Sequence, residues 1–291
     1  MSSSVDPYAE LASLFLTDGD SGPASIPIDG VARGTVRFDE EPMESRTPVP
    51  HHAVAPIEIA LVGHLPVMGG LWLTQYADQV ARREGPTALV RLERGQVSLE
   101  LLRAPGSRGV LERAISVDVE LTEIGDAAAR WIVCPQNEAS LDGPLPGDAL
   151  SLLTGGDDAA TVAAYRIMKN LAERWHVAGW HVPPIGLVVL GAPADRVEEV
   201  AEKLDRTTKA FLDVDLAIVG QHQRMDAIES ASRRTFQGVE LSVDDVCRRA
   251  RECSRRSARR ATGTVAAGQQ GSVTRVGPIV AKLAPKPLGR E

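Results

Sequence analysis

Short apolar runs that alternate with helical patterns constrain the fold of this chain more than any other feature of its sequence. Ile57–Val62 (IEIALV) and Ile185–Leu190 (IGLVVL) are nearly continuous apolar runs, of the kind found in strands buried on both faces of a sheet. Each run therefore predicts a core strand. Similar runs occur at 87–92, 131–134, 149–153 and 216–219.

Helical patterns connect these runs. Apolar residues recur every three or four positions over 70–84, and Gly85 is well placed to end that helix. A second helix is predicted to start after Asp157, and a third at Asp195 with Phe211 on its inward face. Strands that alternate with helices predict an α/β fold with a doubly wound, mostly parallel sheet flanked by helices.

Composition divides the chain into three parts. Residues 1–55 are rich in Gly, Pro, Ser and acids, so we expect a mostly disordered segment. Residues 56–240 form the predicted α/β domain, and residues 241–291 are predicted to be a basic tail, partly helical and then flexible. One short apolar helix is expected within the first segment, with its face formed by Tyr8, Leu11, Leu14 and Phe15.

The tail differs in charge from the rest of the chain. Residues 247–291 contain eleven Lys or Arg and two acids, a net charge of +9, whereas the whole chain is at −7. This asymmetry predicts an anionic partner for the tail, with the chain's own acidic body as the alternative. Bulky apolar residues are missing from the run, which argues against a membrane helix. The arginines concerned are Arg248, Arg249, Arg251, Arg255, Arg256, Arg259 and Arg260.

Several classes of protein are excluded by what the sequence lacks. It has no run of about 18 apolar residues, so we expect no transmembrane segment. The first residues lack the pattern of a secretory signal. Cys134, Cys247 and Cys253 lack the spacing of a zinc site or a disulfide framework, which favours idle thiols in a reducing compartment. A cytoplasmic protein without a metal site is the resulting expectation.

The turn after the first predicted strand is the most informative place for function. Doubly wound sheets bind ligands beyond the carboxyl ends of their strands, and the first turn often holds phosphate at a helix N-terminus. Here that turn contains Gly63, His64, Gly69 and Gly70. The glycines alone are a weak signal, because tight turns and close helix–strand packing also need glycine. His64 is a candidate anion contact.

Three later stretches make the pattern more specific. Residues 154–169 end in a "DAYxxIK"-like helix, residues 187–216 resemble "VVN…FLGVxL", and residues 219–228 resemble "LGxIPxDxxV". In this order and spacing, the chain resembles the MinD/ParA-type P-loop ATPases, most of all the FlhG (FleN) branch, over about residues 57–235. The resemblance implies a fold that binds ATP and magnesium, dimerises across ATP, and controls flagellar number and placement.

The resemblance also implies which nucleotide-binding residues have been replaced. Against the phosphate loop GKGGVGKTT, the two lysines fall on His64 and Gly69, and the magnesium-binding hydroxyl falls on Gly70. Pro66 removes a backbone N–H from the same loop. The phosphate loop therefore lacks the groups that the family uses to hold phosphate and metal.

The acidic positions of the family are replaced as well. The first acid after the second strand corresponds to Arg91, with Glu93 close behind it, and the metal-facing acid corresponds to Val133. The adenine-side asparagine corresponds to Leu190. Losing the lysine and metal contacts costs about 3–6 kcal/mol, or roughly 10²–10⁴ in affinity.

These losses predict a non-catalytic regulatory or scaffolding relative with no cofactor and no metal. Its expected partners are proteins, among them an intact MinD/ParA relative, together with the anionic partner of the basic tail. The alternative is a divergent ATPase that still binds ATP and Mg²⁺. The two differ in whether Mg-ATP binds at all.

Overall fold

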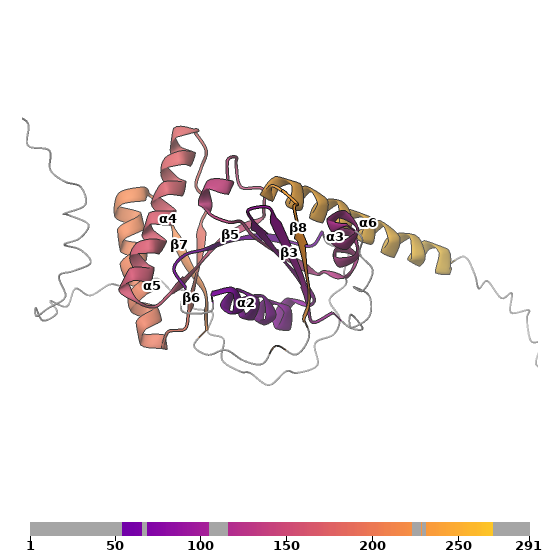
Figure 1. Ribbon diagram of the computed structural model, residues 1–291, viewed down its shortest axis with the longest axis horizontal. Coiled ribbons are helices and arrows are strands. Elements are labelled where there is room, and N and C mark those ends of the chain that lie inside the picture. The colour runs from indigo at the N-terminus through magenta and orange to yellow at the C-terminus, as the bar shows by residue number, and fades with distance from the viewer. Residues whose placement is uncertain (1–53, 66–68, 105–115, 223–227, 229–230, 270–291) are drawn as a thin grey trace, which may run out of the picture.

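The computed structural model describes residues 54–65, 69–104, 116–222, 228 and 231–269, and it contains one eight-stranded sheet in the order β7-β6-β5-β1-β4-β2-β3-β8 (Figure 1). The predicted helix at Tyr8 to Phe15 and the end of the tail lie outside these residues. The strands are β1 (Ile57–Val62), β2 (Thr87–Glu93), β3 (Gln96–Leu102), β4 (Arg130–Cys134), β5 (Ala149–Gly155), β6 (Ile185–Leu190), β7 (Leu216–His222) and β8 (Ala231–Gln237). The helices are α2 (Gly69–Glu84), α3 (Val117–Ala127), α4 (Asp158–Val177), α5 (Ala194–Leu212) and α6 (Val243–Gln269), with a short 3-10 helix, η2 (Glu138–Ser140).

The sheet is mostly parallel. Strands β7, β6, β5, β1, β4 and β2 pair in parallel, whereas β3 is antiparallel to both β2 and β8. The predicted α/β fold, a mostly parallel sheet flanked by helices, is confirmed. Because the chain moves from β1 towards β2 on one side and later returns to β5 on the other, the strand order reverses at β1. The carboxyl end of β1 is therefore the place where such a sheet offers a ligand site.

The two faces of the sheet are covered unequally. On one face, α2 packs Leu73 and Ala77 against strand residues such as Leu89. On the other face, α3, α4, α5 and α6 share one large core with Ile59 and Val133. Figure 1 shows α2 below the strands at the centre, while α3 and α6 lie at the upper right. This arrangement leaves the N-terminus of α2 beside the carboxyl ends of β1 and β2.

Three elements were not predicted from the sequence. Strand β3 follows β2 through a tight turn in which Gly95 has φ +66°, and α3 begins after Ser116, whose side chain accepts a hydrogen bond from the N–H of Val119. Strand β8 then adds to the free edge of β3. One local prediction is wrong: Phe211 is 54% exposed, because the buried face of α5 ends at Thr208.

The arginine-rich run forms α6, and its first half is part of the packed body. Val246, Cys247 and Ala250 are buried in the large core, and Cys253 lies against Gly125 of α3. The stripe that packs is made of small side chains, so it is narrow. The C-terminal half of α6 projects past α3 (Figure 1). No helix of the described residues is long and apolar enough to cross a membrane.

Candidate functional site

The turn after β1 is fastened to β5 by the backbone. The N–H of Gly63 donates to the carbonyl of Leu153 at 2.8 Å, and the N–H of Gly155 donates to the carbonyl of His64 at 2.9 Å. A Cβ at Gly63 would lie 3.3 Å from the Leu153 oxygen, so glycine suits this close approach. The His64 side chain is exposed. Residues 66–68, including Pro66, lie outside the described residues.

Arg91 lies under the first turn of α2 and is almost completely buried, with 6% of its surface exposed. One terminal nitrogen donates to the carbonyl of Gly70 at 2.9 Å and also to the hydroxyl of Thr74. The same nitrogen lies 3.2 Å from a carboxylate oxygen of Glu100 on β3. The guanidinium therefore joins β2, β3 and α2 at the edge of the sheet where a phosphate would be expected.

Glu100 balances this charge. Its side chain is 2% exposed, and it accepts a hydrogen bond from the Thr74 hydroxyl at 3.1 Å. Arg233 of β8, whose side chain is half exposed, lies 3.3 Å from the same carboxylate. Burial lowers the pKa of Arg91 from its ordinary value, and the charge of Glu100 opposes that shift. Arg91 stays cationic, since guanidinium groups do not lose their proton in proteins.

Thr74, Glu100 and Arg233 were not predicted from the sequence. An acid within the otherwise apolar alternation of 97–102 was the available signal for Glu100. The other two were not recognisable from the sequence, because Thr74 is an ordinary helical residue and Arg233 comes from a strand more than 100 residues away.

The predicted site residues are only partly brought together. Gly63, His64, Gly70 and Arg91 lie at one edge of the sheet, near the start of α2 at Gly69. Glu93 lies apart, at the end of β2 beside the β2–β3 turn, where it accepts a hydrogen bond from Gln96 at 3.4 Å. Val133 is completely buried in the large core, on the face away from α2.

Arg91, the buried cation at this edge of the sheet, is paired with Glu100. Neither Val133 nor Gly70 carries a side-chain oxygen that could bind a metal ion. Throughout the described ranges, no group of three or more His, Cys, Asp or Glu is arranged to hold a metal ion.

Cys134, at the end of β4, lies close enough for the charge of Arg91 to influence it. Burial raises the pKa of its thiol to about 12, while Arg91 acts in the opposite direction. A thiol with so high a pKa is protonated at neutral pH and is a poor nucleophile. The predicted interpretation of idle, buried thiols is consistent with the burial of Cys134, Cys247 and Cys253.

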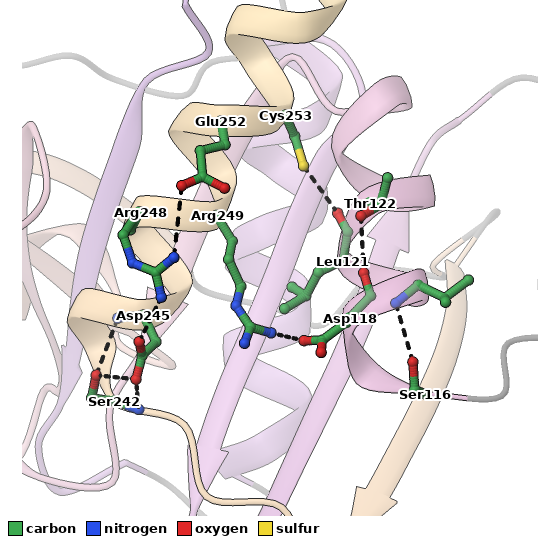
Figure 2. A network of polar contacts seen from close by, with 11 residues as sticks. Ser116, Asp118, Leu121, Thr122, Ser242, Asp245, Arg248, Arg249, Glu252 and Cys253 are labelled. Atoms are coloured by element: carbon green, nitrogen blue, oxygen red, sulfur yellow. Dashed lines mark hydrogen bonds and ion pairs between the residues drawn. The ribbon is translucent and has the colours of Figure 1, made fainter.

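The arginines of α6 form a second polar site, against α3 (Figure 2). Arg249 pairs with Asp118, and Arg248 lies 2.8 Å from Asp245 and 3.6 Å from Glu252. A groove of about 280 Å³ between the two helices is lined by residues that include these arginines and Arg256. The groove thus combines cationic and anionic side chains.

The other arginines of α6 differ in their surroundings. Arg251 donates to the carbonyl of Pro146 at 2.5 Å and lies 3.8 Å from Asp148, so it faces the body of the domain. Arg255, Arg256 and Arg259 are exposed. The side chain of Arg260 lies outside the described residues.

A buried carboxylate fixes the strand next to this site. Glu120 of α3 is completely buried, and the Nε of Arg234 on β8 lies 3.6 Å from one of its oxygens. Neither oxygen accepts a hydrogen bond from the described residues. Burial raises the pKa of Glu120, the charge of Arg234 lowers it, and Glu123 raises it further. The folded state therefore holds a proton on Glu120 more tightly than the unfolded chain does.

We expect this carboxylate to make the protein more stable as the pH falls. The pKa of Glu120 is raised on folding, so folding takes up a proton, and stability rises through the folded-state pKa until the unfolded value of about 4.3 is passed. In the Glu120→Gln variant, the free energy of unfolding should lack this part of its dependence on pH. Urea unfolding at a series of pH values from about 7 down to about 4 measures this slope. Equal slopes in both proteins would contradict the prediction.

Comparison with known proteins adds no assignment. No protein-family model matches the chain, and no curated protein matches it. The case for a function consequently depends on the geometry of the two polar sites and on the resemblance of the sequence motifs.

Proposed function

We propose that this protein is a non-catalytic relative of the MinD/ParA-type ATPases, and that it regulates or scaffolds protein partners in the cytoplasm without a nucleotide cofactor. The observation that supports this most directly is the buried ion pair between Arg91 and Glu100 beneath the α2 N-terminus. The motif resemblance supplies the class of protein, and the ion pair supplies a physical reason for the lack of ATP binding.

The ion pair between Arg91 and Glu100 disfavours the binding of a phosphate at the N-terminus of α2. A helix N-terminus attracts anions because its first N–H groups are unpaired and its dipole is positive there. Arg91 donates to the carbonyl of Gly70 and lies 3.2 Å from Glu100, so its charge is balanced without phosphate. To use Arg91, a nucleotide would have to break this buried pair, and separating one partner from the other costs about 3–5 kcal/mol.

If the protein binds no nucleotide, we expect it to act through protein partners. Relatives of this type dimerise across ATP, so a member that binds none needs another kind of contact. An intact MinD/ParA relative is the partner that we propose, in the positioning of flagella or of other cell structures. An anionic partner for α6 is compatible with the same role.

A divergent ATPase is the competing function. One observation favours it: the turn from Gly63 to Gly69 leads into a helix at the reversal point of the sheet. Such a protein would have to bind Mg-ATP without the Arg91 guanidinium. The two functions therefore make opposite predictions about a single titration.

Titration of Mg-ATP into the full-length protein, followed by calorimetry, tests the proposal. We expect no saturable binding up to millimolar nucleotide, since the lost contacts weaken a micromolar site by roughly 10²–10⁴. The matched control is His64→Gln, because His64 is the exposed side chain of the turn. Micromolar binding would overturn the proposal, and weaker binding in His64→Gln would locate the nucleotide at this turn.

A further inference from the structure

The second half of α6 carries positive charge that the helix itself does not balance. After Glu252, α6 contains no acidic residue but has four arginines: Arg255, Arg256, Arg259 and Arg260. The first three are exposed in the structure. Arg248, about two to three helical turns earlier on the exposed side, already pairs with Asp245 and Glu252. We call Arg248, Arg255, Arg256 and Arg259 the arginine face.

The chemistry of the arginine face limits which kind of partner can bind there. Every exposed side chain of α6 from 243 to 259 is charged. A membrane surface needs bulky apolar residues opposite the cations, and the centre of a protein interface is depleted in charge. The occupant that fits is therefore an extended anionic chain, held by charge alone.

The N-terminal segment joins the fold next to α6. The N–H of Ile57, at the start of β1, donates to Asp148 at 2.8 Å, and the other oxygen of Asp148 lies 3.8 Å from Arg251 of α6. One side chain therefore separates the first strand from the helix. Anything within residues 1–53 is covalently linked to the start of β1, beside α6, so it meets the helix at a raised effective concentration.

The tethered segment has the complementary charge. Residues 1–53 contain nine acids and three arginines. Four of the acids lie within residues 39–44: Asp39, Glu40, Glu41 and Glu44. The chain from 44 to 57 can extend over roughly 43–47 Å at about 3.3–3.6 Å per residue. Helix α6 is about 40 Å long at about 1.5 Å per residue. Hence the whole arginine face is within reach.

We propose that residues 39–44 bind in cis to the arginine face of α6. Individual exposed ion pairs are weak, but four carboxylates on a short tether need little affinity each. An external anionic partner, such as nucleic acid, would then have to displace this segment before it reached the arginines. The proposal does not depend on the non-catalytic function, because the contact is independent of nucleotide.

A distance measurement between two spin labels tests it in the full chain. The first label is placed by Pro42→Cys, which keeps all four acids, and the second by Val119→Cys, because Val119 is 45% exposed on α3 beside the groove. Native thiols do not interfere: all three are buried, and burial raises the pKa of Cys134 and Cys247 to about 12. The matched control replaces Val119→Cys by Val177→Cys, 91% exposed at the end of α4.

If residues 39–44 bind α6 in cis, the distance between the labels at positions 42 and 119 should be short at low salt, and its distribution should be narrow. It should become broad at about 1 M NaCl, where the Debye length falls to about 3 Å. The triple variant Arg255→Glu/Arg256→Glu/Arg259→Glu should broaden it too. Adding Glu40→Arg, Glu41→Arg and Glu44→Arg to that variant should restore it. The matched charge control is Arg166→Glu/Arg206→Glu, exposed arginines of α4 and α5, which should change nothing.

Two results would overturn the proposal. One is a broad 42–119 distance that the α6 charge reversal leaves unchanged. The other concerns a short DNA duplex as competitor: if neutralising residues 39–44 does not raise the affinity of the protein for the duplex, the segment does not occupy the arginine face. An increase of about tenfold or more, together with loss of the short distance when duplex is added, supports it.

Discussion

Replacing Arg91 by methionine is expected to lower the free energy of unfolding by about 3–5 kcal/mol, the cost of leaving a buried charge without its partner. Glu100 is 2% exposed, and without Arg91 its carboxylate would keep the hydroxyl of Thr74 and, as a cation, the half-exposed Arg233. Methionine fills much of the space of the arginine stem but offers no proton to the carbonyl of Gly70 or to Thr74. Urea unfolding of wild type and variant measures the loss.

A variant that lacks both charges distinguishes the contribution of the ion pair to stability from that of side-chain packing. Arg91→Met/Glu100→Gln should be more stable than Arg91→Met, because no uncompensated buried charge remains. Arg94→Met on the exposed β2–β3 turn serves as the control and should change stability by no more than about 0.5 kcal/mol. A loss in Arg91→Met no larger than in the Arg94 control would show that the network does not hold α2 to the sheet.

Gly125→Ala is expected to destabilise the contact between α3 and α6, with a cost of about 1–3 kcal/mol for an overpacked core. A Cβ at this position would lie 2.4 Å from the Cβ of Cys253, 2.9 Å from its sulfur and 3.2 Å from the ring of Trp131. On helix propensity alone the change would be stabilising by roughly 0.5–1 kcal/mol, so the sign distinguishes the two effects. Urea unfolding gives the sign, and hydrogen exchange of α6 amides reports its local release.

A second substitution, on α6, should compensate for the methyl group that Gly125→Ala adds to α3. Gly125→Ala/Cys253→Gly removes the two atoms closest to the new methyl group and leaves the ring of Trp131, so it should recover part of the loss despite a glycine inside α6. Gly143→Ala is the neutral control, since no atom lies within 4 Å of a Cβ placed there. A Gly125→Ala variant as stable as the control would mean that α6 does not lie against α3 in this way.

The parallel core was predictable because its signal is local. Runs such as Ile57–Val62 and Ile185–Leu190 carry their burial in their own composition, and Gly85 ends α2 as expected, with φ +101°. The elements that were missed depend on distant partners. Strand β8 has two arginines in seven residues and no apolar alternation, and it is held through Glu120 on α3 and Glu100 on β3.

The candidate site was predictable only in part, for a similar reason. Alignment of motifs located Arg91 as a replacement, but its role depends on Glu100 in a strand that the sequence analysis did not assign. Val133 shows the opposite case: its aligned position implied the metal edge, whereas its side chain is completely buried in the core. In α6 the charged pattern was visible, while the packing stripe of Cys247 and Ala250 was too narrow to recognise.

The pairing of β3 with β8 has a consequence for the newly made chain. Ser98 and Thr235 meet across this pair although 137 residues separate them. Until the ribosome has released the last part of the domain, the outer edge of β3 has no neighbour, and its backbone groups are open to pairing with other chains. Strand β8 is therefore translated long after β3, and the outer edge of β3 stays uncovered until then. We therefore expect nascent chains stopped before residue 231 to aggregate more readily than the complete domain.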